Sequence, residues 1–573
     1  MDKNEEIYFS PKNKINKAIH AFTYGQMIMF IIFLLGFFIS LFLILDKINE
    51  KYLVERPLSG GKIEEGVIGS PRFINPVLAS SSTDRDLATV IFSGLMKKNV
   101  SGRMQTDLAE SYEASADGLT YTFTIKESAV FHDNTKVTSD DIVYTITQIQ
   151  DGALKSPYQP SWQSVSVIKI DERTVQFRLS SPYSSFLENT SVGILPSHVW
   201  KDLGTDDFTF SDMNLYAIGS GPYKISNIDK KKNGLIESIS LKSFKDYAGP
   251  KAFIEKITFV FYRNEEELTK AFRRNKVDQI NAISGEQARA LSSEGENITN
   301  VNLSRVFGIF FNANKQEIFR NKNIARAIDL AINKAEIVDL VLGGYGKVID
   351  SPIPENIYDS LKESSYNRAE NLAEAKSILD KEGWVLGTDG LRTKAGQTLK
   401  FSISTGDAPE LQKATNIIKD NLKEVGVLVE VKVFDIGNLN QSVIRPREYE
   451  SLFFGQIIAS ESDLFAFWHS SQRNDPGLNI ASYTNSKVDG LLERIISSTN
   501  ESDKSNYFKE LEDEIKKDYP AVFIYSPDFI YLMDSKVQNI VIDKITIPSE
   551  RLRHINDWYI RTEKVWSFLN KQN

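Results

Sequence analysis

The chain has 573 residues, of which 41% are hydrophobic and 25% are charged, and it contains no cysteine. These proportions are typical of folded globular protein, and the length predicts about three or four domains. The net charge of −8 argues against a nucleic-acid-binding role for the whole body. The lack of cysteine excludes disulfides, thiolate metal sites and a lipid anchor on an N-terminal cysteine.

The first pronounced element is an uncharged apolar segment from Met27 to Leu45. As an α-helix it would be about 28 Å long, close to the roughly 30 Å of a bilayer core. Asp46 follows it directly, without the small-x-small site of a signal peptide. We therefore predict an uncleaved transmembrane anchor rather than a buried helix or a signal peptide. Lysines flank both ends, so the positive-inside rule does not orient it.

Residues 46–62, which include PLSGG at 57–61, are predicted to form a linker after the anchor. Residues 119–126 and 173–179 alternate apolar and polar side chains, which predicts half-buried strands. Between them, Thr138 and Asp141 form a capping-box pattern ahead of a helix. The helix is expected to bury Ile142, Ile146 and Ile149.

Hydrophobic stripes at helical spacing predict helices over 324–332, 372–379 and 411–425. Gly383 and Gly426 are expected to end the second and third of these. Valines alternate along 427–433, which predicts a strand. The fold class is therefore mixed α/β, and we interpret the stripes as core.

No catalytic or phosphate-binding motif stands out. Residues 219–223 (GSGPY) are interpreted as a tight turn between strands, because Pro222 lacks the backbone donor that a phosphate loop needs. There is no GxSxG nucleophile motif. The five histidines form no HxxxH or HExxH pair, so we expect no metal site and no cofactor. They are His20, His132, His198, His469 and His554.

One acidic pair has a distinctive setting. Glu461 and Asp463 follow an apolar run and precede Phe465, Phe467 and Trp468. A carboxylate close to aromatic rings suits the recognition of a ligand amine through ion pairing and cation–π contact. A surface loop carrying ordinary acids explains the same pattern equally well.

Several strings, in a fixed order, resemble the family 5 extracellular solute-binding proteins, which are the oligopeptide, dipeptide and nickel receptors of ABC importers. The strings are PRFINP at 71–76, DLATVIFSGL at 86–95, LAESY at 108–112, SADGLTYTF at 115–123, FHDNTKVTSDDIVY at 131–144, GSGPY at 219–223, ARAI at 325–328 and AINK at 331–334, followed by Asn479, Tyr483, Val488, Asp489 and DYP at 518–520. Most relatives have Gly where this chain has Asn134, and Asn tolerates a left-handed turn nearly as well.

This resemblance implies a periplasmic-binding-protein-like fold of two lobes with an additional domain. Lobe I would comprise residues 63–95, 215–305 and 525–573, the additional domain residues 96–214, and lobe II residues 306–524. The resemblance also implies a single-pass protein of the bacterial cytoplasmic membrane, with residues 1–26 inside and the rest outside.

The implied function is the capture of peptides or peptide-like solutes by a monomeric receptor that delivers them to the permease subunits of an ABC importer, without chemistry. One alternative is a sensor or interaction protein that binds a signal peptide or a cell-wall fragment. A cell-wall peptide hydrolase is a further alternative, against which the missing nucleophile and metal motifs count. Nickel binding has little support from scattered histidines.

The resemblance also suggests ligand contacts. Peptide-binding relatives hold the ligand amine with an Asp just after Gly-Trp, whereas this chain has Gly455 followed by Gln456. Counting from Gly455 places the acid at Ala459, and counting back from residues 467–470 places it at Glu461. Glu461 is our first choice and Asp463 the second, and no arginine is assigned to a ligand carboxylate. The other expected contacts are Gln456, Phe454, Trp468, Phe310, Asn312, Tyr345 and Ser82, with core packing competing for Phe310 and a hydroxyl-rich turn for Ser82.

Overall fold

The computed structural model describes residues 23–181, 186–355, 357–358, 367–498 and 500–566. The chain divides into two compact units. One combines Met1–Leu58 with Arg561–Asn573 and is called the anchor unit below. The other, Ser59–Ile560, is called the body.

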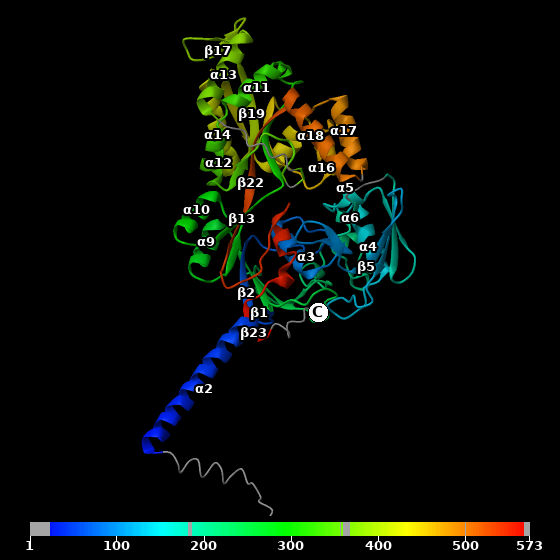
Figure 1. The fold of residues 1–573 in the computed structure, drawn as a ribbon. Helices are drawn as coiled ribbons and strands as arrows, with labels where there is room; N and C mark the ends of the chain where they lie inside the picture. Colours follow the sequence, from blue (N-terminus) through cyan, green and yellow to red (C-terminus); the bar gives the residue numbers. More distant parts are fainter. Residues whose placement is uncertain (1–22, 182–185, 356, 359–366, 499, 567–573) are drawn as a thin grey trace, which may run out of the picture. The chain divides into compact units, whose positions relative to one another are not determined.

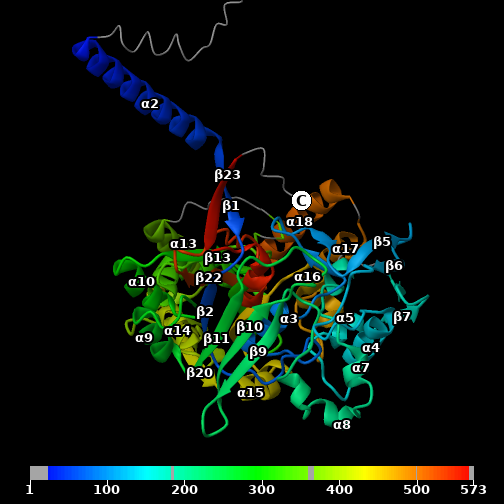
Figure 2. The same cartoon turned by 90° about the horizontal axis from the view of Figure 1, so that it is seen from below.

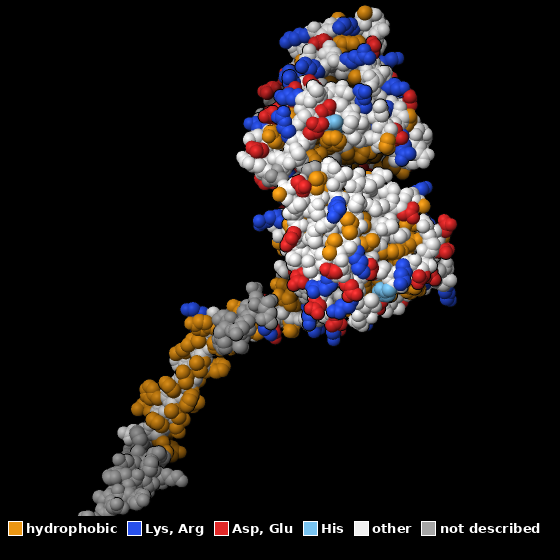
Figure 3. All heavy atoms as spheres, turned by 90° about the vertical axis from the view of Figure 1, so that its right-hand side faces the viewer, with side chains coloured by type: hydrophobic (Ala, Val, Ile, Leu, Met, Phe, Trp, Pro, Cys, Tyr) orange, Lys and Arg blue, Asp and Glu red, His pale blue; other side chains and the backbone are white. Residues whose placement is uncertain are grey.

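The anchor unit begins with α2 (Tyr24–Tyr52), whose residues Tyr24–Asn49 are long and apolar enough to cross a membrane. Figure 3 shows that hydrophobic side chains cover this helix. The predicted linker is wrong for residues 46–58, because α2 continues to Tyr52 and β1 (Leu53–Leu58) follows. β1 pairs antiparallel with the C-terminal strand β23 (Arg561–Trp566), which the sequence analysis assigned to lobe I. The rings of Tyr52 and Trp566 stack with centroids 6.5 Å apart.

A 12-stranded sheet runs through the body, and Figures 1 and 2 show it from two sides. Ten of its strands follow one path, and the other two, β13 (Ile298–Asn302) and β15 (Gly346–Val348), pair with β22 beside that path. The order along that path is β20 (Leu428–Phe434), β19 (Lys400–Gly406), β21 (Ser451–Ile457), β14 (Arg305–Phe311), β22 (Ala521–Met533), β12 (Gln279–Asn281), β2 (Lys62–Ile68), β11 (Lys256–Tyr262), β10 (Ile236–Ser243) and β9 (Tyr223–Lys230).

The body has two halves, and the chain crosses between them along β22 and between β13 and β14. The start of β22 pairs with β14, and its end pairs with β12 and β13. The two crossings contact each other, since the Leu303 amide donates to the Pro527 carbonyl at 3.0 Å and the Ser526 hydroxyl donates to the Leu303 carbonyl at 2.9 Å. We call the half with β2 and β9–β13 the first half, and the half with β14 and β19–β21 the second half.

The second half packs helices on both faces of its strands (Figure 1). Ile324, Ala327 and Ile328 are buried as predicted, and so are the other helix stripes at Ala375, Leu379, Ile418 and Leu422. Gly383 and Gly426 follow their helices with φ of 84° and 81°, as expected of C-terminal glycines. One face carries α11 (Lys322–Ala331), α12 (Lys334–Leu342), α13 (Arg368–Lys381) and α14 (Pro409–Lys423), and the other α16 (Glu461–Trp468), α17 (Ser486–Ser497) and α18 (Glu501–Asp518).

The first half includes a separate four-stranded antiparallel sheet packed with α4 (Ser139–Gln150). The predicted capping box is confirmed, with Thr138 as the N-cap and Asp141 returning to its backbone amide. Ile142, Ile146 and Ile149 are buried, as predicted. The sheet order is β5 (Ala109–Ala114), β6 (Thr120–Ile125), β8 (Thr174–Leu179) and β7 (Val165–Lys169), so both alternating segments form strands.

The GSGPY turn leads into β9 and lies against the end of α3 (Ser82–Ile91). A Cβ on Gly219 would lie 2.0 Å from the Ile91 carbonyl oxygen, so glycine is required there. Buried His132 bridges the turn, accepting from the Gly219 amide at 3.2 Å and donating to the Gly221 carbonyl at 3.1 Å. The turn is therefore a close-packing element, and Asn134 beside it has the expected left-handed φ of 70°.

The remaining elements are short or peripheral. They are β3 (Met96–Lys98), β4 (Met104–Thr106), β16 (Val385–Leu386), β17 (Arg392–Lys394), β18 (Gln397–Thr398), α5 (Gln159–Trp162), α6 (Phe186–Asn189), α7 (Ser197–Trp200), α8 (Thr205–Phe208), α9 (Glu265–Arg273), α10 (Gly285–Ser293), α15 (Ile436–Asn438), η1 (Asp212–Asn214), η2 (Glu317–Arg320), η3 (Leu439–Ile444), η4 (Ser470–Gln472), η5 (Pro548–Leu552) and η6 (Ile555–Asp557).

Candidate ligand-binding site

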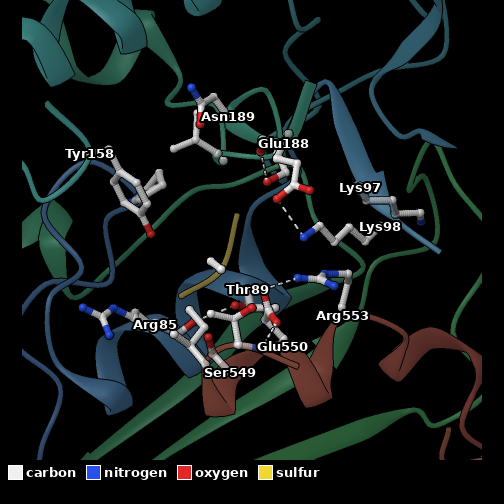
Figure 4. Close-up of a pocket in the computed structure, with 18 of the residues that line it drawn as sticks. Arg85, Thr89, Lys97, Lys98, Tyr158, Glu188, Asn189, Ser549, Glu550 and Arg553 are labelled. Carbon is white, nitrogen blue, oxygen red and sulfur yellow. Dashed lines mark hydrogen bonds and ion pairs between the residues drawn. The ribbon is translucent and has the colours of Figure 1, made fainter. Parts of the chain in front are cut away.

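A cavity of about 670 Å³ lies between the two halves of the body. That volume falls within the range of about 300–1,000 Å³ common for ligand pockets. The first half contributes α3, β3, Tyr158, residues around Glu188 and the segment around η5, and the second half contributes the start of α16 with Ile457 and Leu478. Figure 4 shows how α3, β3 and η5 converge on this space.

Ion pairs within the protein neutralise most of the charged groups that line the cavity. Lys98 Nζ lies 2.8 Å from Glu188 Oε2, and Arg553 Nη2 lies 2.6 Å from Glu550 Oε1. Lys97 pairs with Asp107 at 3.3 Å. These groups therefore give the wall polarity without leaving a net charge for a ligand.

Tyr158 contributes a phenol hydroxyl to the cavity wall. Figure 4 shows its ring across from α3, with the hydroxyl directed toward the side that carries Arg85. Burial raises the pKa of Tyr158, and the positive charge of Arg85 partly opposes that rise. The phenol therefore stays neutral at physiological pH and can donate or accept one hydrogen bond.

The two predicted acids have different positions. Asp463 lines the cavity. Its Oδ2 accepts hydrogen bonds from the backbone amides of Ala459 at 2.8 Å and Ser460 at 2.9 Å, which caps α16. Burial raises the pKa of Asp463. Glu461 is not among the lining residues, and it accepts from Lys504 Nζ at 3.0 Å. The second choice thus lines the cavity and the first does not.

Four other predicted contacts lie away from the cavity wall. Phe310 and Trp468 are core side chains of the second half, with ring centroids 6.2 Å apart, and Phe454 packs against the same core. Asn312 is buried and donates to the Arg447 carbonyl at 3.0 Å. Core packing, the competing interpretation for Phe310, is what this structure shows. The geometry gives their predicted ligand contact no support.

The remaining predicted contacts also lie outside the lining. Tyr345 packs against the hydrophobic cluster of α9 and α10. Ser82 is exposed at the start of α3, where neighbouring Ser81 caps the helix by accepting from the Asp84 amide at 3.0 Å. Gln456 is 3% exposed, and neither amide atom has a hydrogen-bond partner among the described residues.

Sequence reasoning missed most of the lining because it comes from segments far apart in the chain. Thr89 lies within the string at 86–95 and Arg85 directly precedes it, but neither residue has a motif of its own. Glu188, Glu550 and Arg553 have no local signal at all, since only the fold brings them together. Among the described residues, no group of three or more His, Asp and Glu side chains is arranged to hold a metal ion.

The model for bacterial extracellular solute-binding proteins of family 5 (middle) matches residues 103–476. The match covers more than half of the chain, so the chain belongs to this family. Its mixed α/β fold is that of the periplasmic peptide-binding proteins.

Several relatives match over nearly their whole length. The oligopeptide-binding protein AppA of Bacillus subtilis is 24% identical over 89% of this chain and 94% of its own. Its structure with a nonapeptide aligns with a TM-score of 0.68 at 24% identity, covering 88% of this chain and 100% of that one. The structure of NikA from Brucella suis with Fe(III)-EDTA aligns with a TM-score of 0.75 at 20% identity, covering 87% and 100%. At these identities the structural likeness establishes the fold alone.

Proposed function

We propose that this protein is a membrane-anchored receptor that captures a peptide or peptide-like solute and delivers it to an ABC importer. The observation that carries the proposal is the cavity of about 670 Å³ between two halves that are joined by two chain crossings. Such a joint allows the halves to close on a ligand and to open again. Membership of a solute-binding family supports the same conclusion.

The proposed mechanism has no chemical step. The open form captures the solute, the halves close, and the closed form docks on the permease. Our division into lobe I, lobe II and an additional domain remains part of the proposal. The separate hydrophobic clusters of the two halves support it, although β23 pairs with β1 instead of extending lobe I.

Anchoring is the second part of the proposal. The apolar helix within α2 would cross the cytoplasmic membrane once, with the body outside as a monomer. A tether of this kind keeps the receptor at a high effective concentration near its permease. We propose Asp463 for the amine end of the ligand, because it lines the cavity and its Oδ1 has no hydrogen bond among the described residues.

The test uses the full chain in detergent micelles. Native mass spectrometry is expected to show co-purified or added short peptides bound in a 1:1 ratio. Thermal melts should rise with peptide concentration, because a ligand at 100 times its Kd adds about 2.7 kcal/mol of stability. Protein that stays empty and unshifted across a peptide library would refute capture, and hydrolysis of the library would instead favour an enzyme.

Delivery is tested separately. Gentle solubilisation of native membranes and affinity isolation of the full chain should recover permease subunits of an ABC importer when peptide is present. Isolation with bound peptide but with no permease under crosslinking would favour a sensor over an importer component.

A further inference from the structure

Two arginines, one lining the cavity and one beside it, have no counter-ion among the described residues. Arg85 lines the cavity from the first turn of α3. Its side chain makes no hydrogen bond or ion pair with any described residue. The second is Arg305, the first residue of β14, which is not itself a lining residue and has no ion pair within the described chain. Its Nε is fully buried and without a hydrogen-bond partner.

Arg305 lies where the chain crosses between the halves, flanked by two segments of the cavity wall. On one side it stands opposite Ile457 of β21, which lines the cavity. On the other side, Leu303 pairs with Ile545, next to lining residues Thr546 and Ile547. The side chains of directly opposite residues share one face of a sheet, so Arg305 and Ile457 face the same side.

The two arginines also act on each other. Burial and the nearby positive charge of Arg85 lower the pKa of Arg305. Placing a guanidinium near a like charge, partly out of water, costs free energy unless an anion compensates. Acids elsewhere in the lining do not supply it, because Asp107, Glu188 and Glu550 pair with lysine or arginine and Asp463 caps α16.

We propose that Arg85 and Arg305 form the anion subsite of the cavity and bind a carboxylate of the ligand. A planar guanidinium binds a carboxylate through paired hydrogen bonds, and two of them can hold both of its oxygens. The carboxylate belongs either to the peptide C-terminus or to an acidic side chain. This inference rests on the proposed function and makes it more specific, since it selects acidic ligands.

The experiment measures how the end group of a peptide affects retention. Full-length protein in detergent is immobilised and incubated with a synthetic library of uncharged-residue peptides of four to six residues. Each sequence is made as a free acid, as a C-terminal amide, and as an amide carrying one Glu. Retained peptides are quantified by mass spectrometry. We expect the free acid or the Glu-bearing amide to exceed the plain amide by roughly 10- to 100-fold, and the arm that does so identifies the source of the carboxylate.

Variants then assign the preference to the two residues. Arg85→Gln and Arg305→Gln should each reduce the acid-to-amide ratio by about tenfold, while Arg85→Lys should keep part of it. Arg72→Gln is the matched control, because Arg72 is an exposed arginine of the same half outside the cavity lining. Its ratio should equal that of the wild type, and thermal melts of all variants report whether the fold is kept.

Equal retention of acids and amides by the wild type would overturn the inference, and so would a ratio unchanged in both glutamine variants. Either result leaves capture itself intact, since peptides would still bind. Failure to retain any form, together with unshifted melts, would refute the proposed function and with it the inference. If Arg305→Gln unfolds, the acid-to-amide ratios of the wild type and of Arg85→Gln still test the inference.

Discussion

Replacing Arg551 with methionine is expected to destabilise the body strongly. Arg551 lies in η5 and is 0% exposed. Its guanidinium donates to both oxygens of Asp86 at 2.9 and 2.7 Å and to Glu65 Oε1 at 2.7 Å. The Tyr531 hydroxyl donates to Glu65 Oε2 at 2.7 Å, which ties β22 to the same cluster. Two carboxylates, one from β2 and one from α3, thus pair with a single guanidinium.

The size of the expected destabilisation follows from the two carboxylates that the substitution leaves without a cation. Glu65 and Asp86 are each 1% exposed at the side chain, so both carboxylates would remain buried without their cation. Breaking such a pair typically costs about 3–5 kcal/mol. With an unfolding entropy of about 2.1 cal/mol/K per residue over a body of about 500 residues, that cost lowers Tm by about 3–5 °C if the body unfolds cooperatively.

The assay is thermal unfolding of the full chain in detergent, followed by circular dichroism. Arg263→Met is the control, because Arg263 forms an ion pair with Glu267 while 85% exposed, and solvent screening makes the loss of such a pair nearly neutral for Tm. Adding Glu65→Gln and Asp86→Asn to Arg551→Met should recover part of the loss, since no buried charge would then lack a partner. A Tm for Arg551→Met equal to that of Arg263→Met would refute the reasoning.

Other predictions concern the turn beside α3 and the strand pair of the anchor unit. Burial lowers the pKa of His132 to about 4, so its stabilising contribution is complete above about pH 6.5 and is lost as the pH falls toward 4. The loss amounts to about 3 kcal/mol, and His132→Gln should flatten the Tm–pH profile in that window, whereas an unchanged slope would contradict it. Gly219→Ala should cost several degrees of Tm because its Cβ meets the Ile91 carbonyl, while Gly490→Ala, in open space on α17, should raise Tm slightly, and equal effects would count against the packing argument. Arg56→Ala removes a partly exposed ion pair with Glu563 and should change Tm by less than about 1 °C, so a larger drop would show that the strand pair depends on it.

Elements specified by local pattern could be predicted from the sequence. The capping box at Thr138 and the left-handed turn at Asn134 depend on a few adjacent residues, and both are present. The helix stripe at Ile324 depends on spacing alone and is likewise confirmed. Interactions within one or two turns are set by the residues that make them, so distant context changes them little.

The strand pair of the anchor unit could not be predicted in that way. Residues 53–58 (LVERPL) lack strict alternation and contain a proline, which usually demotes a strand. They form a strand because residues 561–566 pair with them in register, with Leu53 opposite Trp566 and Leu58 opposite Arg561. A pairing across some 500 residues has no local signal.

A second limit on prediction from the sequence concerns the charged groups of the candidate site. Glu461 and Asp463 look equally available in the sequence, yet Lys504, forty-three residues away, pairs with Glu461. Arg85 shows the reverse, because nothing in its neighbourhood suggests that it lacks a counter-ion. What a charged group can do for a ligand depends on whether the protein has already neutralised it. The sequence pattern draws attention to the two acids, whereas only the fold shows that Arg85 and Arg305 have no counter-ion among the described residues.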